Sequence, residues 1–362
     1  MSKKYLVKLM PTGKFFFGGD MRFGINGENG EFSSYIIESS KMPQQTSLLG
    51  MMRFLLLSNN DDLFDVKNNC IKNGVSVEGM IGKTGFTVKE EKNDYGKILS
   101  LGPCCVCKDG KRYFKTPMDK AFSSINWDNV VTATINGKEV QLPELKVIVD
   151  GKEDYYSGKY NPDPSFMEYS SSEEIKEDKL FIKDSRIGID KVYEGKSQTD
   201  AFYKQISYRL ENGYCFAFDV KVDESVDLTE YNGQLVSLGA DASSFIFNAE
   251  IIDDIESADK DGLSVVLLSD AYISDEMMKK TQMRYSVNNM RPFRFISTNN
   301  SSDASYYRIN GKNAAKRSER YELYQAGSVF YFEKEEQTKD FCDILKSRED
   351  FNQIGYNKYY IK

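Results

Sequence analysis

Four dipeptides that favour tight reverse turns set the strongest limit on how this chain can fold. Each of them lies between two runs of alternating apolar and polar residues: Asp109-Gly110, Asn136-Gly137, Asp150-Gly151 and Asn212-Gly213. Asn-Gly and Asp-Gly supply the positive φ angles of two-residue turns between antiparallel strands. The pattern therefore predicts that the middle of the chain forms β-hairpins.

The remaining patterns predict a few helices around these hairpins. We expect a helix over about 44–57 after Pro43, a short helix within 59–74 and a late helix in "TKDFCDILKSRE", with strands over "KKYLVKLMP" and "GSVFYFE". A chain of 362 residues exceeds one average domain, and the polar stretch 157–177 is the best boundary. The predicted fold class is α+β with antiparallel sheets, in two domains of residues 1–165 and 166–362.

The composition excludes several kinds of chemistry. There is no histidine, so Ser-His-Asp and Cys-His catalysis and histidine metal sites are excluded. The thiols of "CCVC" lack zinc-site spacing and are expected to be reduced, and "GKT" lacks the upstream glycine of a phosphate-binding loop. No apolar run is long enough for a membrane span or a signal peptide, so we expect a cytoplasmic protein. We expect no catalytic residue, metal or cofactor, and therefore a binding protein.

The net charge of −7 conceals a strong segregation of charge along the chain. Fifteen acidic residues and two lysines lie between Asp219 and Glu276, whereas ten basic and two acidic residues lie between Met277 and Arg320. A charge run is commonly a solvated face. Basic segments in an acidic chain also suit a local polyanion site, because the acidic surface suppresses non-specific binding.

Arg53 is the sharpest single feature, because it is the one charged residue within the apolar stretch from Leu48 to Leu57. A buried guanidinium needs a partner, which is either a carboxylate elsewhere in the chain or a phosphate. The preceding residues Gln44, Gln45, Thr46 and Ser47 place polar groups around the free N–H groups of a helix N-terminus, which attracts anions. The sequence leaves both kinds of partner open.

The motifs "PTGKFFFGGD" and "PQQTSLLGMMRFLLL" together resemble the opening of the third subunit of Cmr complexes, the type III-B CRISPR effectors. This subunit belongs to the repeat-associated mysterious protein (RAMP) superfamily. Three later segments are similar to that family in the same order: "SRIGIDKVYEGKSQTDAFYKQISYRLENGYCFAF", "LVSLGADASSF" and "YQAGSVFYFE". The family's late glycine-rich loop is reduced here to "QIGYNKYYI", with Gly355 as its one glycine.

The resemblance implies two ferredoxin-like domains and a non-catalytic protein that binds CRISPR RNA (crRNA) through its 5′ repeat-derived tag. It also implies contacts with the large polymerase/cyclase-like subunit and the RAMP backbone subunits, in antiviral defence. We expect the RNA-binding residues in four groups: Lys14 and Phe15; Gln44, Gln45, Thr46 and Arg53; Arg186, Lys191 and Lys196; and Arg284, Arg291, Arg294, Lys316 and Arg317.

Several of these residues also fit a role without RNA. Phe15 can be an ordinary core residue, the cations near Arg186 can be plain surface charge, and the late arginines can face an acidic partner subunit.

Two different functions also remain for the whole chain. Some RAMP relatives cut CRISPR repeat RNA, although such an endoribonuclease would have to work without histidine. A purely structural scaffold would pair its cations internally.

Overall fold

Strand β1 (Ser2–Pro11) lies near the centre of a nine-stranded antiparallel sheet, between β16 and β18. The computed structural model describes residues 2–19, 21–25, 32–83, 85–135, 138–149, 151–155, 164–191, 197–241, 243–253, 261–297, 308–309, 312–313 and 316–362. The strand order is β13-β12-β8-β7-β16-β1-β18-β17, and β6 also pairs with β16. The strands other than β1 are β6 (Ile98–Leu101), β7 (Cys105–Lys108), β8 (Lys111–Lys115), β12 (Ser165–Glu168), β13 (Glu174–Lys176), β16 (Cys215–Asp223), β17 (Leu235–Ser237) and β18 (Ser244–Ile251).

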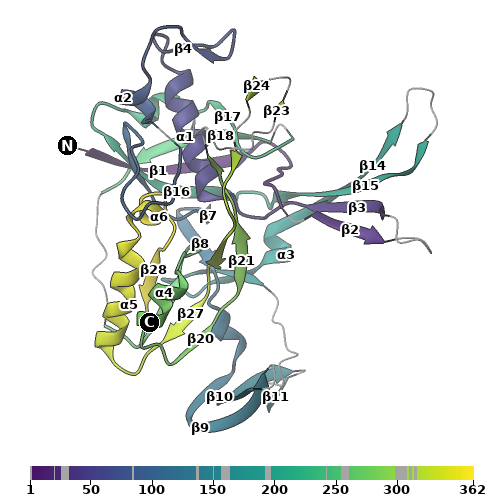
Figure 1. The fold of residues 1–362 in the computed structure, drawn as a ribbon, viewed down its shortest axis with the longest axis vertical. Helices are drawn as coiled ribbons and strands as arrows, with labels where there is room; N and C mark the ends of the chain where they lie inside the picture. The colour runs from purple at the N-terminus through teal and green to yellow at the C-terminus, as the bar shows by residue number, and fades with distance from the viewer. Residues whose placement is uncertain are drawn as a thin grey trace.

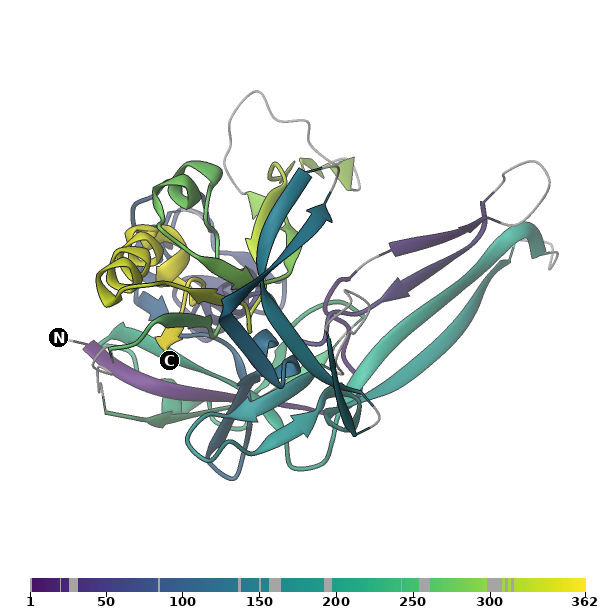
Figure 2. The same cartoon turned by 90° about the horizontal axis from the view of Figure 1, so that it is seen from below.

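Two strand assemblies extend from this body (Figure 1, Figure 2). The first is a four-stranded sheet, which we call the arm. Its strands are β14 (Phe181–Lys191), β15 (Ser197–Leu210), β3 (Phe32–Glu38) and β2 (Met21–Ile25), and β15 and β3 run parallel. The second is the three-stranded sheet of β9 (Ser124–Ile135), β10 (Lys138–Val149) and β11 (Lys152–Tyr155).

The late part of the chain forms a second sheet and several short strand pairs. The sheet contains β20 (Tyr285–Val287), β27 (Val329–Tyr331), β19 (Ser264–Leu267) and β28 (Tyr359–Ile361). The pairs are β21 (Met290–Phe293) with β26 (Tyr321–Tyr324), β22 (Ile296–Ser297) with β25 (Lys316–Arg317), β23 (Arg308–Ile309) with β24 (Lys312–Asn313), and, earlier in the chain, β4 (Phe64–Asp65) with β5 (Cys70–Ile71).

Three of the four predicted hairpins are confirmed by the strand register. Residue pairs directly before and after the turn face each other in β7–β8, β9–β10 and β10–β11. The fourth hairpin prediction is wrong, because Asn212-Gly213 connects β15 of the arm to β16 of the nine-stranded sheet. Strand β16 pairs with β1 on one side and with β6 and β7 on the other, so it has no free edge for β15.

The predicted long helices are confirmed as α1 (Gln45–Ser58) and α5 (Glu335–Ser347). The shorter helices are α2 (Glu78–Ile81), α3 (Glu177–Leu180), α4 (Asp275–Lys280) and α6 (Glu349–Gln353), with 3-10 turns at Met118–Ala121 and Leu228–Tyr231. The helix predicted within 59–74 is wrong, because β4 and β5 form a small hairpin there. The Asp65 carboxylate accepts hydrogen bonds from the backbone N–H groups of Lys67 and Asn68, which stabilises a turn in place of a helix.

Helix α1 shares the main hydrophobic core with the nine-stranded sheet. Its residues Leu48 and Met52 are fully buried in the same cluster as Tyr5 of β1 and Phe216 of β16. A second cluster lies beneath α5, where Phe341 packs against Phe330. The first core thus fixes α1 on the sheet and determines where its N-terminus lies.

The architecture confirms the α+β class, with few helices and mostly antiparallel sheets. The nine-stranded sheet takes β1, β6, β7 and β8 from before residue 165 and its other strands from 165 onward. The predicted division into residues 1–165 and 166–362 stays a prediction. Within the ranges that the structure describes, no helix has the length and apolar character needed to cross a membrane.

Candidate nucleic-acid interface

The N-terminus of α1 opens into a large cleft between distant parts of the chain. This cleft, with a volume of about 1490 Å³, is bordered by the loop after β1, the segment from Glu38 to Arg53, the ends of β8 and β12, and residues 290–295 in and after β21. Six cations line it against three carboxylates: Lys41, Arg53, Lys115, Arg291, Arg294 and Arg320 against Glu38, Glu177 and Asp270. We call it the basic cleft.

The entrance of α1 has the features of an anion site. Gln44 has extended backbone angles, its side chain makes no capping hydrogen bond, and the first turn of the helix contains no acidic residue. The carbonyl of Gln44 accepts the N–H groups of Ser47 and Leu48. The positive end of the helix dipole therefore faces the cleft without a carboxylate of its own first turn to neutralise it.

Gln45, predicted to bind RNA, has a structural role instead. Its side chain is 4% exposed, and Nε2 donates to the carbonyls of Gly102 at 2.8 Å and Ile354 at 2.7 Å. Its Oε1 accepts the N–H of Cys104 at 3.2 Å. These bonds occupy the amide and attach the start of α1 to both β6 and the C-terminal segment. Gln44 and Thr46 are half-buried and line the cleft.

Arg53 also lines the basic cleft, and its side chain contacts α2. Its Nε donates to the carbonyl of Ile81 at 2.8 Å. Burial lowers the pKa of Arg53, and the nearby Tyr95 and Asp94 oppose this shift. Over the ranges that the structure describes, Arg53 makes no ion pair within 4.0 Å, so the carboxylate partner considered from the sequence is not found there.

The late arginines fall into two separate places. Arg291 in β21 pairs with Asp270. Arg291 and the exposed Arg294, which follows the same strand, both line the cleft. Arg284 lies elsewhere: its guanidinium stacks over Trp127 at 5.5 Å, and its Nε is 3.6 Å from Glu333. The sequence grouped these residues into one basic region, and the structure divides them between the cleft and the base of the β9–β10 hairpin.

Glu177 partly neutralises the cleft. It pairs with both Lys41 and Lys115 and is 6% exposed. Burial acts to raise the pKa of Glu177, but the two lysines outweigh burial and hold the pKa below its usual range. Neither lysine was singled out from the sequence, since the residues of this triad are separated by more than 60 positions and share no motif.

Phe15 is a core residue, which corrects its assignment to RNA. It is 1% exposed, and its ring lies 4.7 Å from that of Phe17 and 5.2 Å from that of Phe216. A ring so enclosed offers no face to a base. Lys14 beside it is half-buried and lies outside the cleft.

Among the remaining candidates, Arg186 does not line the cleft. Arg186 is exposed on β14 of the arm, and Lys191 ends that strand. Lys316 and Arg317 form β25, which pairs with β22. The side chains of Lys191, Lys316 and Arg317, and all of Lys196, lie outside the described part of the chain. The arm borders the cleft at its base, through Glu38 of β3 and Tyr208 of β15.

Among the described residues, no group of three or more histidine, cysteine, aspartate or glutamate side chains is placed to hold an ion. The six cysteines are free thiols. The cations of the basic cleft and the free backbone N–H groups at the N-terminus of α1 together can bind an extended anion.

Comparison with known proteins gives one strong match. Residues 7–362 match the family model described as "CRISPR-associated protein (Cas_Cmr3)". No curated protein matches. The chain is also similar to a chain in the cryo-EM structure of the type III-B Cmr-beta complex bound to cognate target RNA. The identity is 13%, the TM-score is 0.51, and the match covers 99% of this chain and 96% of that one.

Two further solved structures are more distant. A chain of the same Cmr-beta complex, bound to cognate target RNA and AMPPnP, matches with a TM-score of 0.49, 13% identity and coverage of 99% and 96%. A chain of the Csm3-Csm4 subcomplex of a type III-A interference complex matches with a TM-score of 0.34, 13% identity and coverage of 91% and 93%. At such identity the likeness concerns the fold. The family match, which spans nearly the whole chain, confirms the resemblance found in the sequence: this chain belongs to the Cas_Cmr3 family of CRISPR-associated proteins.

Proposed function

We propose that this chain is a non-catalytic subunit of a type III-B CRISPR effector and holds the 5′ repeat-derived tag of the crRNA in the basic cleft. One observation carries the proposal. The N-terminus of α1, Arg53 and Arg294 line the same cleft, and neither arginine forms an ion pair among the described residues. Phosphates of a single strand are the natural partners of such a set.

The balance of charge supports an extended ligand over an internal salt-bridge network. Glu177 pairs with Lys41 and Lys115, and Asp270 pairs with Arg291, so part of the cleft is already compensated. Arg53 and Arg294 carry the uncompensated charge. Because the cleft spans the helix entrance and the segment after β21, we expect several successive phosphates to contact it.

The bridging of the large polymerase/cyclase-like subunit to the backbone RAMP subunits is part of the same proposal. Several large apolar side chains are exposed on the two projecting assemblies, among them Ile187 at 74%, Tyr155 at 62% and Ile148 at 57%. Exposed apolar positions of this kind suit contacts with other subunits. We assign the arm and the β9–β11 sheet to such contacts, in a cytoplasmic complex without a membrane.

The two ferredoxin-like domains also remain a proposal. Helix α1 covers the sheet that contains β1, and α5 covers the sheet that contains β28, so the chain has two helix-on-sheet layers. The first of these layers also takes β12, β13, β16, β17 and β18 from residue 165 onward. The division at residue 165 is tested by limited proteolysis. Two protected fragments that meet near 157–177 would support it, whereas a first cut elsewhere would contradict it.

The decisive test of RNA binding compares wild type with Arg53→Gln, which removes the charge but keeps a donor for the carbonyl of Ile81. Lys67→Ala, an exposed lysine on the β4–β5 turn, is the matched charge control. Binding to single-stranded RNA with and without the tag is measured over a salt series, for the protein alone and in its complex. We expect tag-dependent binding that weakens with salt, with a slope of log K against log salt about 0.7 smaller in Arg53→Gln.

Unchanged binding in Arg53→Gln, or equal loss in Lys67→Ala, would contradict the assignment of Arg53 to a phosphate. If neither the protein alone nor its complex binds the tag, the chain would instead be a purely structural scaffold. Site-specific cleavage of repeat RNA by the purified protein would instead establish the endoribonuclease.

A further inference from the structure

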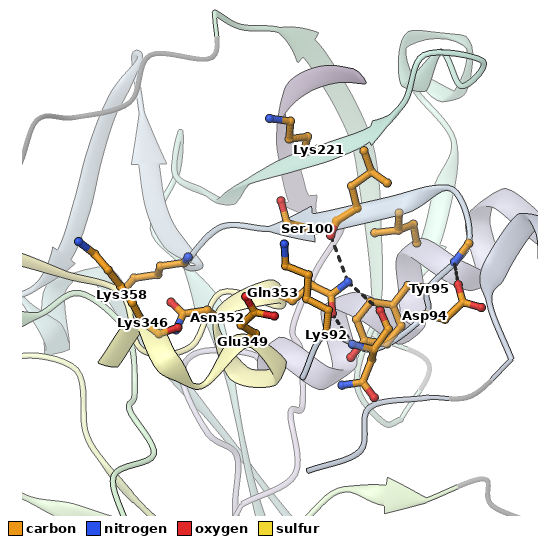
Figure 3. A pocket seen from close by; sticks show the side chains of 14 residues that line it. Lys92, Asp94, Tyr95, Ser100, Lys221, Lys346, Glu349, Asn352, Gln353 and Lys358 are labelled. Carbon is orange, nitrogen blue, oxygen red and sulfur yellow. Dashed lines mark hydrogen bonds between the residues drawn. The ribbon is translucent and has the colours of Figure 1, made fainter. Parts of the chain in front are cut away.

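A second pocket, separate from the basic cleft, lies between α6 and the edge of β6 (Figure 3). Its volume is about 740 Å³, and none of its lining residues borders the cleft. Four lysines line it against two carboxylates: Lys92, Lys221, Lys346 and Lys358 against Asp94 and Glu349. Its size is that of a small-molecule site.

The lysines come from four different segments and are spread along the pocket (Figure 3). Lys92 is in the loop before β6, Lys221 in β16, Lys346 in the last turn of α5, and Lys358 directly before β28. A cation is favourable in the last turn of a helix, which explains Lys346 by itself. No such local cause applies to the other three.

Lys358 is the most unusual of the four. It is half-buried, its backbone N–H donates to Ser269 Oγ at 3.0 Å, and its carbonyl accepts the N–H of Leu268. Over the described ranges neither Lys358 nor Lys92 forms an ion pair within 4.0 Å. Burial, and then the charge of Lys4, lower the pKa of Lys358. A desolvated ammonium without a carboxylate is unfavourable unless an anion joins it.

Three other polar side chains of the pocket form hydrogen bonds within the fold. Gln353 donates to the carbonyls of Asn93 and Leu99, and Asn352 donates to the end of α5. Asp94 accepts the N–H of Gly96. These bonds hold the three side chains in place, whereas the ammonium groups of Lys92 and Lys358 form no ion pair among the described residues.

From this arrangement we propose that the pocket binds an oligophosphate group, through the ammonium groups of Lys92 and Lys358. Ammonium groups are compact charges with rotatable donors, and they bind phosphate oxygens as point charges from separate directions. Their spread along the pocket suits a chain of phosphates better than a single ion. The site lies beyond the function proposed for the cleft and does not depend on it.

The test is calorimetric titration of the full chain with tripolyphosphate at physiological salt. The variant K92A/K358A removes two charges from the pocket. K279A/K280A removes two exposed charges from α4 and is the matched control, and K92R/K358R keeps the charge in case truncation unfolds the protein. We expect K92A/K358A to bind about tenfold more weakly or worse, the control to stay within about twofold of wild type, and the arginine variant to retain binding.

Three results would overturn the proposal: no binding by wild type, equal weakening by K279A/K280A, or equal competition by polyglutamate of matched charge. A competition with short single-stranded RNA then identifies the source of the phosphates. Displacement of tripolyphosphate, in wild type and in Arg53→Gln alike, would assign the pocket to an RNA backbone outside the cleft. Lack of displacement would assign it to a free oligophosphate.

Discussion

The substitution Gly355→Ala tests how the C-terminal segment fixes the helix entrance. Gly355 has φ of +90°, and a Cβ placed there would lie 2.0 Å from Gln45 Nε2 and 2.3 Å from the carbonyl oxygen of Gly102. No real Cβ contact is that short, so the Gln45 side chain has to move. Movement breaks its bonds to Gly102 and Ile354, which join α1 to two other parts of the chain.

The expected cost has two parts. A left-handed backbone costs a residue with a Cβ about 1–2 kcal/mol. Each buried polar group that loses its partner adds about 1–3 kcal/mol. With the carbonyls of both Gly102 and Ile354 left unpaired, we expect Gly355→Ala to lower the free energy of unfolding by about 3–8 kcal/mol, measured by urea unfolding.

Gly74→Ala separates the two parts. Gly74 has a similar φ of +79°, but nothing lies within 4 Å of its Cβ position. This control is expected to lose only the backbone part, about 1–2 kcal/mol. If Gly355→Ala and Gly74→Ala lower the free energy of unfolding by the same amount, the hydrogen bonds of Gln45 do not stabilise the entrance of α1, which would refute this prediction.

Three further outcomes follow from the same contacts. Asp350→Asn leaves the buried Arg348 guanidinium without its carboxylate and is expected to cost about 3–5 kcal/mol in urea unfolding; a loss below about 1 kcal/mol would contradict this. Since the folded-state pKa of Glu177 is depressed, its stabilisation is present above about pH 4 and is lost as the pH falls through the folded pKa. The difference in unfolding free energy between wild type and Glu177→Gln should therefore shrink with acidity, and a constant difference would count against the pairing. Arg294→Ala should weaken RNA binding severalfold while Arg284→Ala should not, because only the former lines the cleft; equal effects in a filter-binding assay would show that the cleft is not the site.

Local features of the fold could be predicted from the sequence because their causes are local. Apolar spacing after Pro43 predicted α1, and the Asp-Gly and Asn-Gly turns predicted three hairpins. The Asn212-Gly213 turn has the same local chemistry, yet its strands enter different sheets. Which strands pair there depends on β1, about 200 residues earlier, and a turn motif carries no information about that.

The candidate site was predictable in part for the same reason. Arg53 and the helix entrance lie in one motif and share the cleft. The roles of Gln45 and Phe15 could not be read from the sequence, since a buried amide and a core ring are identified by contacts with residues far along the chain. Arg291 and Arg294 were grouped with Arg284 by proximity in sequence, and the strand arrangement separates them.

Crosslinking of the crRNA tag within the assembled complex tests the central claim most directly. A crRNA with 4-thiouridine substituted through its 5′ tag is irradiated, and the crosslinked peptides of this subunit are identified by mass spectrometry. We predict crosslinks within 38–53 and 290–295, two of the segments that line the basic cleft, and their loss when the tag is removed. Crosslinks confined to the arm, or the same crosslinks without the tag, would contradict the account.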